Sequence, residues 1–171
     1  MRIQRSGLCA LGFALCVHST ERKAQSRSAP DSQTIVFVCE HGTVKSVLAL
    51  AYFTQLAREK GLPLRAVSRG TAPDSGLPAF MLAGLKRDGF DIGAFVPQGF
   101  SERDLASAIG VISFDQPNVA RVIAGRVPTV AWDRLPSVTA NYGVARDSIK
   151  ARVAGLVDSL ARIKPRRDHR D

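Results

Sequence analysis

One cysteine lies at a point in the chain where its chemistry would be enhanced. In the stretch TIVFVCEHGTVKSVLALA, which begins at Thr34, residues 35–39 are β-prone and mostly apolar, and the residues from Val44 onward have helical periodicity. This predicts a buried strand that turns directly into a helix. Because a helix N-terminus offers unpaired N–H groups and a positive dipole end, residues 40–46 can wrap an oxyanion. A thiol facing such a terminus loses its proton more readily, so Cys39 is a candidate nucleophile beneath a bound tetrahedral anion.

The elements that must position this loop alternate between strands and helices. Besides the first strand, the pattern predicts strands over residues 64–71, 109–114 and 127–132. It predicts helices over residues 44–60, 78–88, 116–124 and 141–163, and a short one that Ser101 caps. The inward face of the last helix is expected to consist of Val144, Ile149, Val153, Leu156, Val157 and Leu160. Strand–helix–strand succession implies right-handed parallel crossovers. We therefore expect an α/β fold, a doubly wound four-stranded parallel sheet flanked by helices, with its ligand crevice at the carboxyl ends of the strands.

The loop and three further segments resemble one family. Cys39-Glu40-His41-Gly42-Thr43-Val44-Lys45-Ser46 is similar to the C-x5-R-S loop of low-molecular-weight protein tyrosine phosphatases and their thioredoxin-coupled arsenate reductase relatives. The segment SRGT at 68–71 resembles the family's S-A-G-T, DGFDI at 88–92 its H-G-I-D-I, and GVISFD at 110–115 its third strand. The resemblance extends from Thr34 to Ile163, and it implies the same doubly wound fold.

The resemblance implies three catalytic roles. In this family the loop cysteine attacks phosphorus, the loop arginine clamps two equatorial oxygens, and a distant aspartate protonates the leaving oxygen. Cys39 matches the nucleophile and Lys45 stands where the arginine is expected. Asp133, just after the fourth predicted strand, is the candidate general acid; its alternative is to cap a turn or pair with Arg134. Asp115 is the competing carboxylate, which we interpret as structural because it ends a strand at a turn.

The other loop residues are expected to surround the anion as substrate-binding residues: Glu40, His41, Gly42, Thr43, Val44 and Ser46. Ser46 matches the family serine that hydrogen-bonds the thiolate, and it can also cap the helix. Gly42 replaces an asparagine, and since both residues tolerate positive φ, the bend of the loop is retained. His41, where the family has glycine, either stabilises the thiolate or faces solvent. Glu40 would repel phosphate unless its side chain points outward.

Lys45 is the main departure from the family pattern. An ammonium is a point charge without the planar fork that matches two oxygens of the transition state, so activity is expected to be weakened or specialised. The leading hypothesis is hydrolysis of phosphate monoesters, phosphotyrosine among them, through a cysteinyl-phosphate intermediate. The alternatives are a non-catalytic oxyanion or phosphoprotein binding module, and an arsenate reductase that uses an external thiol because no cysteine follows Cys39.

The chain outside the predicted domain divides into three short parts. Residues 1–25 are similar to an export signal, since Arg2 and Arg5 precede an apolar run over 8–17 that is too short to span a bilayer. A transit peptide is the alternative. Residues 26–33 are predicted to be a linker, 34–163 the phosphatase-like domain, and 164–171 a charged tail. If the signal is removed, the mature protein has Cys39 alone and no stable membrane span, and we expect it to be periplasmic or secreted.

Composition indicates the kind of partner. The formal net charge of +9 favours anionic partners, here a phosphorylated substrate or an inorganic oxyanion. No basic patch with interleaved aromatic residues occurs, so nucleic-acid binding is not expected. The three histidines, His18, His41 and His169, lack ligand spacing, so we expect no metal site and no cofactor. The sequence does not indicate an oligomeric state.

Overall fold

The computed structural model describes residues 33–123 and 125–163, so the expected export signal and charged tail lie outside the described residues. The strands are β1 (Thr34–Cys39), β2 (Arg65–Gly70), β3 (Ala108–Ser113) and β4 (Thr129–Ala131). The helices are α1 (Lys45–Glu59), α2 (Ala79–Arg87), α3 (Glu102–Leu105), α4 (Pro117–Ile123) and α5 (Tyr142–Ile163).

The strands form one parallel sheet in the order β2-β1-β3-β4. This confirms the predicted doubly wound four-stranded sheet. The chain passes from β1 to β2 on one side and then crosses to β3 on the other side, so the direction of winding changes between β1 and β3. Ligand crevices of such sheets lie at this point, outside the carboxyl ends of the strands.

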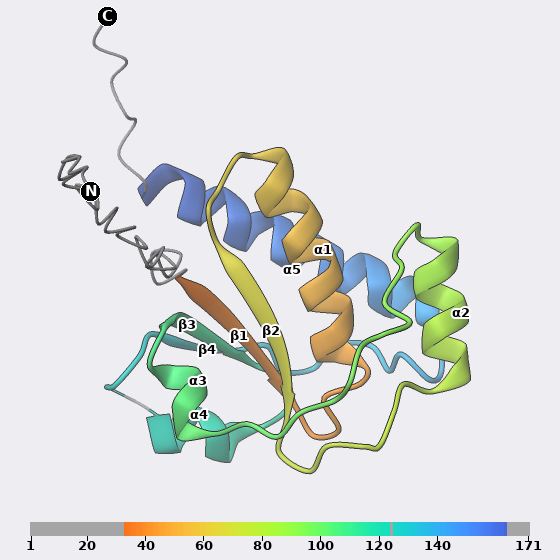
Figure 1. Cartoon of the computed structure of the whole chain (residues 1–171), viewed down its shortest axis with the longest axis horizontal. Helices are drawn as coiled ribbons and strands as arrows, with labels where there is room; N and C mark the ends of the chain where they lie inside the picture. Colours follow the sequence, from red (N-terminus) through yellow and green to blue (C-terminus); the bar gives the residue numbers. More distant parts are fainter. Residues whose placement is uncertain (1–32, 124, 164–171) are drawn as a thin grey trace, which may run out of the picture.

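Helices cover both faces of the sheet (Figure 1). Ile35, Phe37 and Cys39 pack in the larger core cluster, with residues of α1, α2 and α5. Val36 and Val38 point the other way, into a smaller cluster with residues of α4 and the end of α3. Both faces of β1 are therefore buried, as expected for the central strand of a parallel sheet, and the alternation places Cys39 on the α1 side.

Some predicted details are confirmed and others are wrong. The capping box of α3 is present, and in it the Asp104 carboxylate accepts a hydrogen bond from the backbone N–H of Ser101 at 2.8 Å. Val144, predicted to face inward, is 50% exposed, and Ala145 is buried in its place. The fourth strand is shorter than predicted; it begins only after Pro128, which has no N–H to donate, although its carbonyl accepts from Val111 N at 2.9 Å.

A largely buried carboxylate ties three helices together. Asp88, at the end of α2, accepts hydrogen bonds from the hydroxyls of Tyr52 (3.0 Å) and Tyr142 (2.7 Å), and its other oxygen accepts from Arg146 at 2.9 Å. Burial and the neighbouring Asp88 carboxylate raise the pKa of both tyrosines. This network fixes α1, α2 and α5 over the sheet face that carries Cys39.

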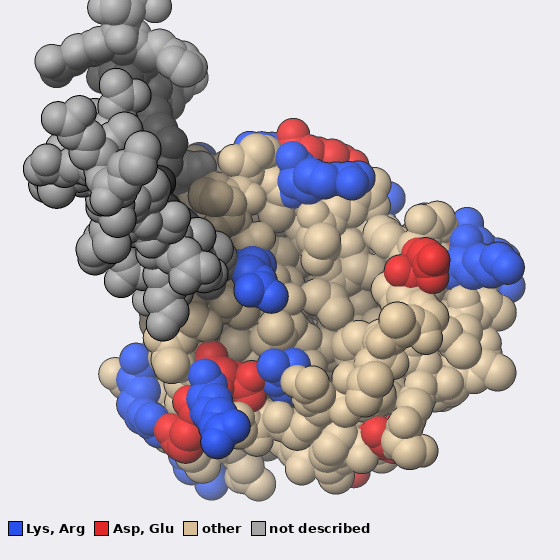
Figure 2. Space-filling model, in the orientation of Figure 1, with Lys and Arg blue, Asp and Glu red and all other residues tan. Residues whose placement is uncertain are grey.

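The described surface mixes both signs of charge. On the face drawn in Figure 2, lysine and arginine side chains lie beside aspartate and glutamate side chains in several places. Ion pairs such as Arg126–Glu102 and Lys60–Asp158 account for part of this mixing. Within the described ranges, no helix is both long enough and apolar enough to cross a membrane.

Candidate active site

The loop that follows β1 curls around the sulfur of Cys39. The backbone N–H of Gly42 donates to Sγ at 3.2 Å, and Ser46 Oγ lies 2.9 Å from it. Ser68, on the neighbouring strand β2, places its Oγ 2.8 Å from Ser46 Oγ and 3.0 Å from the Gly42 carbonyl oxygen. Donors directed at the sulfur stabilise negative charge on it. The serine that the resemblance assigned to the thiolate is therefore in contact with the sulfur.

Two glycines allow this loop to pack against β2 backbone to backbone. Gly42 has a φ of +68°, and a Cβ there would lie 2.8 Å from Gly70 N. A Cβ on Gly70 would in turn lie 2.9 Å from Gly42 N and from the carbonyl carbon of His41. The prediction that Gly42 preserves the bend through positive φ is confirmed, and the close approach adds a second reason for glycine.

The N-terminus of α1 points its unpaired donors toward the same loop. The helix begins at Lys45, and the N-cap residue Val44 makes no side-chain hydrogen bond to it. The first intrahelical bond runs from Leu48 N to Val44 O at 3.1 Å. The amides that precede Leu48 therefore have no intrahelical acceptor, and together with the helix dipole they favour an anion beside Cys39.

A pocket of about 270 Å³ opens above the sulfur. It is formed by the loop after β1, by the residues after β3 and by the segment after β4. The lining residues are Cys39, Glu40, His41, Val44, Lys45, Phe114, Asp115, Gln116, Leu135, Ser137, Val138 and Thr139. This is the crevice that the sheet topology predicts.

The six loop residues predicted to surround the anion divide into two groups. Three of them line the pocket, namely Glu40, His41 and Val44. The other three are buried and support the loop from within, namely Gly42, Thr43 and Ser46. The Glu40 side chain is 63% exposed, so the carboxylate lies at the rim of the pocket and keeps much of its contact with water.

The one lysine of the pocket is held by a carboxylate. Lys45 Nζ forms an ion pair with Asp115 Oδ2, and the Lys45 side chain is only 19% exposed. The other oxygen of Asp115 accepts from the backbone N–H of Arg134 at 3.2 Å. Asp115 itself has a φ of +53°, a left-handed conformation that aspartate tolerates better than most residues. The aspartate that the sequence suggested was structural therefore lies inside the pocket and fixes its cation.

Asp133, the predicted general acid, is placed differently. It is exposed and follows Trp132, whose ring packs on Phe37 and Phe114 in the core. Asp133 is not among the residues that line the Cys39 pocket, although Leu135 on the same segment is. The structure thus brings the loop residues and Lys45 together around the sulfur, and leaves Asp133 at the margin.

Asp74 is a site residue that sequence reasoning missed. Its carboxylate contacts two residues of the loop: Oδ1 lies 3.1 Å from His41 Nδ1, and Oδ2 accepts from the Thr43 hydroxyl at 2.9 Å. The signal that could have found it was its position in the Pro/Gly-rich segment directly after β2. Parallel strands end at the same edge of a sheet, so this segment must lie beside the Cys39 loop.

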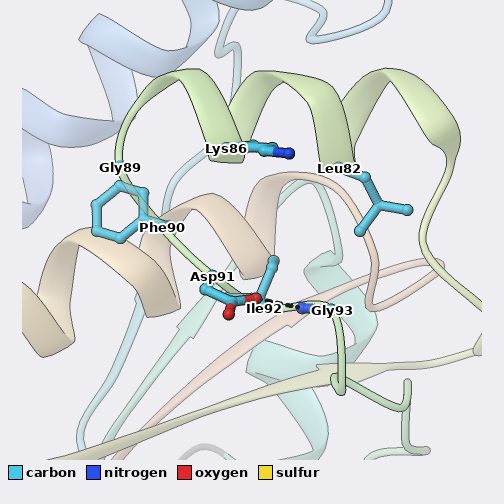
Figure 3. A pocket seen from close by; sticks show the side chains of 7 residues that line it. All are labelled: Leu82, Lys86, Gly89, Phe90, Asp91, Ile92 and Gly93. Atoms are coloured by element: carbon cyan, nitrogen blue, oxygen red, sulfur yellow. Dashed lines mark hydrogen bonds between the residues drawn. The ribbon is translucent and has the colours of Figure 1, made fainter.

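A second pocket has no comparable chemistry. It has a volume of about 440 Å³ and lies between α2 and residues 89–93 (Figure 3). Lys86 and Leu82 extend from the helix above it, and Asp91 below is turned to the backbone N–H of Gly93, 3.2 Å away. None of its lining residues is a cysteine, serine, threonine or histidine, so we assign the active site to the Cys39 pocket. Within the described residues, no cluster of His, Cys, Asp and Glu is arranged to hold a metal ion.

Comparison with solved structures gives several chains of the same fold. YfkJ from Bacillus subtilis has 21% identity and a TM-score of 0.69, over 81% of this chain and 99% of its own. A thioredoxin-dependent arsenate reductase from Corynebacterium glutamicum has 19% identity and a TM-score of 0.65, over 80% and 65%. The arginine phosphatase YwlE from Geobacillus stearothermophilus has 20% identity and a TM-score of 0.56, over 76% and 91%. At these identities the likeness shows the fold.

Comparison with curated protein sequences gives no significant match. Among family models, the one described as low molecular weight phosphotyrosine protein phosphatase matches residues 34–130, more than half of the chain. The matched range contains the whole Cys39 loop, Ser68 and Asp115. The chain therefore belongs to the low molecular weight phosphotyrosine protein phosphatase family.

Proposed function

We propose that the protein hydrolyses phosphate monoesters through a cysteinyl-phosphate intermediate. The observation that carries this proposal is the position of Cys39 Sγ. It lies at the N-terminus of α1, within hydrogen-bond distance of Gly42 N and Ser46 Oγ, in the pocket that holds Lys45. A sulfur in this setting supports attack on a tetrahedral anion held by the same donors.

The reaction has two displacements at phosphorus. The Cys39 thiolate attacks, a P–S bond forms, the P–O bond to the leaving group breaks, and the leaving oxygen takes a proton from a general acid. Water then attacks phosphorus with loss of a proton to the same group, the P–S bond breaks, and phosphate and thiolate are released. Lys45 and the loop amides hold the phosphoryl oxygens in both steps.

We propose Asp133 as the general acid and Asp115 as the residue that holds Lys45. Both oxygens of Asp115 already accept from donors, Lys45 Nζ and Arg134 N, which suits holding the ammonium. Asp133 would have to approach the pocket with the segment that carries Leu135. Leaving groups of low pKa need little protonation, so loss of the acid should slow phenyl phosphate much more than p-nitrophenyl phosphate. Asp133→Asn should show this selective loss, and Asp115→Asn should change the turnover of both substrates by the same factor.

The deciding experiment compares turnover of p-nitrophenyl phosphate by the wild type, Cys39→Ser and Lys45→Arg. Cys39→Ser should abolish turnover, since a serine hydroxyl is a far weaker nucleophile at neutral pH than a thiolate. Lys45→Arg should raise turnover, because it restores the planar two-oxygen clamp. Turnover that survives in Cys39→Ser would refute the mechanism.

Two further functions follow from particular observations. The Asp115 carboxylate holds Lys45 and limits its use in stabilising a transition state, so a non-catalytic oxyanion or phosphoprotein binding module is the second candidate. That function predicts no turnover by wild type or Lys45→Arg while phosphate still protects Cys39 from alkylation. An arsenate reductase would need an external thiol to release arsenite, since Cys39 is the only cysteine in the described residues. Thiol-dependent arsenite production would identify it.

The pocket walls indicate the leaving group to include in a substrate panel. Glu40, whose carboxylate is exposed, lines the pocket, whereas the one phenyl ring among its described lining residues, that of Phe114, belongs to a residue that is 1% exposed. Carboxylates attract a cationic leaving group, and a buried ring cannot stack on a phosphotyrosine side chain. YwlE is an arginine phosphatase, and phosphoarginine should therefore be assayed beside phosphotyrosine.

A further inference from the structure

We infer that His41 contacts the bound anion, so that His41 and Lys45 together replace the two-oxygen clamp of a single arginine, and that Asp74 is the positioning residue for His41. The inference rests on the proposed anion site and names a binding residue in it. Among the described residues lining the pocket, two have basic side chains, His41 and Lys45. Asp115 pairs with the ammonium, and the imidazole lies between two carboxylates, Asp74 at 3.1 Å and Glu40 at 3.7 Å.

Asp74 holds the loop at three points. Its Oδ1 lies 3.1 Å from His41 Nδ1, its Oδ2 accepts from the Thr43 hydroxyl at 2.9 Å, and its backbone N–H donates to the His41 carbonyl at 3.2 Å. The segment after β2 runs beside the loop after β1, and Ala72 N adds a further bond to Glu40 O at 2.8 Å. The backbone and the ring of His41 are therefore fixed together.

This arrangement leaves one imidazole nitrogen for a ligand. The Asp74 carboxylate beside Nδ1 sets the orientation of the ring. The other nitrogen, Nε2, lies 3.7 Å from Glu40 Oε2, which is within ion-pair distance but too long for a hydrogen bond, so its hydrogen-bonding capacity is not used by Glu40. The His41 side chain is 51% exposed and lines the same pocket as Cys39. An N–H at Nε2 can donate to an oxygen of the anion.

If His41 and Lys45 each contact one oxygen of the anion, a lysine can replace the arginine of this loop. An ammonium engages one region of a phosphoryl group as a point charge, and the planar fork of arginine engages two oxygens. The loop that contributes His41 curls over the sulfur, and Lys45 reaches the pocket from the first turn of α1. A second donor from the loop therefore supplies the second oxygen contact that a lysine alone lacks.

The test uses phosphate protection of Cys39 against alkylation by iodoacetamide, which reports anion binding without turnover. His41→Asn and His41→Gln separate the two ring nitrogens. An asparagine amide can still donate to Asp74 but has nothing at the place of Nε2, whereas a glutamine amide reaches the place of Nε2. We expect His41→Asn to weaken phosphate protection by about tenfold or more, as for loss of a charge-assisted hydrogen bond, and His41→Gln to recover part of it. Wild-type protection in His41→Asn would overturn the inference.

The role of Asp74 is tested by a double-mutant cycle. Asp74→Asn should weaken phosphate protection in the wild-type background and have little further effect in the His41→Asn background, because Asp74 acts through the ring. Equal losses in both backgrounds would show that Asp74 only shapes the loop, and would overturn its positioning role. Glu102→Gln, which removes a surface carboxylate paired with Arg126, is the matched control and should leave protection unchanged. Protection that depends on His41 in a protein without turnover would uphold the inference and refute the hydrolase proposal. Absence of phosphate protection in the wild type would refute the inference.

Discussion

Gly42 and Gly61 offer a direct test of why the Cys39 loop needs glycine. Both have positive φ, +68° and +62°, but a Cβ on Gly42 would lie 2.8 Å from Gly70 N, whereas one on Gly61 would meet nothing within 4 Å. Gly61→Ala should therefore lower the free energy of unfolding only by the cost of the left-handed conformation, about 1–2 kcal/mol. Gly42→Ala should lower the free energy of unfolding by the same cost and by a further ~1–3 kcal/mol, because the new Cβ clashes with backbone atoms and one of the two segments must shift. The expected total for Gly42→Ala is about 2–5 kcal/mol.

Thermal unfolding measures both losses. At roughly 4 °C per kcal/mol for a domain of this size, the Tm should fall by about 4–8 °C in Gly61→Ala and by about 8–20 °C in Gly42→Ala. Phosphate protection of Cys39 from alkylation should be retained in Gly61→Ala and lost in Gly42→Ala, because the shifted N–H no longer faces the sulfur. Equal Tm losses together with retained protection in Gly42→Ala would refute the claim that the loop is shaped by its close approach to Gly70.

The remaining predictions concern side chains outside the Cys39 pocket that hold the helices in place. Asp88→Ala should destabilise the protein by about 2–4 kcal/mol in urea unfolding, because it leaves the hydroxyls of Tyr52 and Tyr142 without their acceptor, while Arg146 keeps its second partner, Asp147. The raised pKa values of Tyr52 and Tyr142 mean that the folded state keeps protons that the unfolded chain releases above pH 10.0, so stability should fall as pH rises beyond that point, and the double variant Tyr52→Phe, Tyr142→Phe should lose this slope. Asp104→Ala should cost about 3–5 kcal/mol, since it leaves the Arg69 guanidinium without its carboxylate and removes the acceptor for Ser101 N in the capping box of α3; a loss below about 1 kcal/mol would show that water replaces the contact.

Local patterns predicted most of the fold. The apolar run over 35–39 is buried on both faces, as a central parallel strand requires, and Ser101 with Asp104 marks the start of α3. Prediction failed where contacts between helices decide which residues are buried. The inward face of α5 begins one residue later than periodicity suggested, at Ala145, and the helix packs beside α1, a contact that periodicity does not indicate.

The site was predictable only as far as one continuous segment extends. The nucleophile and most of the groups nearest to it lie in the single loop over residues 39–46, so their spacing in the sequence indicates how they are arranged in space. The two carboxylates that hold the loop come from far along the chain: Asp74 lies 31 positions after Thr43, and Asp115 lies 70 positions after Lys45. The sheet brings both to the loop because β2 and β3 flank β1 on either side. Periodicity and spacing describe neighbours along the chain, so they could not indicate these contacts.

The Lys45–Asp115 pair leads to a last prediction, about the strength of anion binding. An incoming anion must share the Lys45 ammonium with the Asp115 carboxylate, which already occupies it and is itself held by Arg134 N. Asp115→Asn keeps the shape of that side chain and an oxygen for Arg134 N but removes the competing charge. Phosphate protection of Cys39 should therefore improve by about 1 kcal/mol, roughly fivefold, in line with a partly exposed ion pair. Weaker protection in Asp115→Asn would mean that the carboxylate serves mainly to hold the ammonium in place, and that an unrestrained lysine cannot bind the anion in this loop.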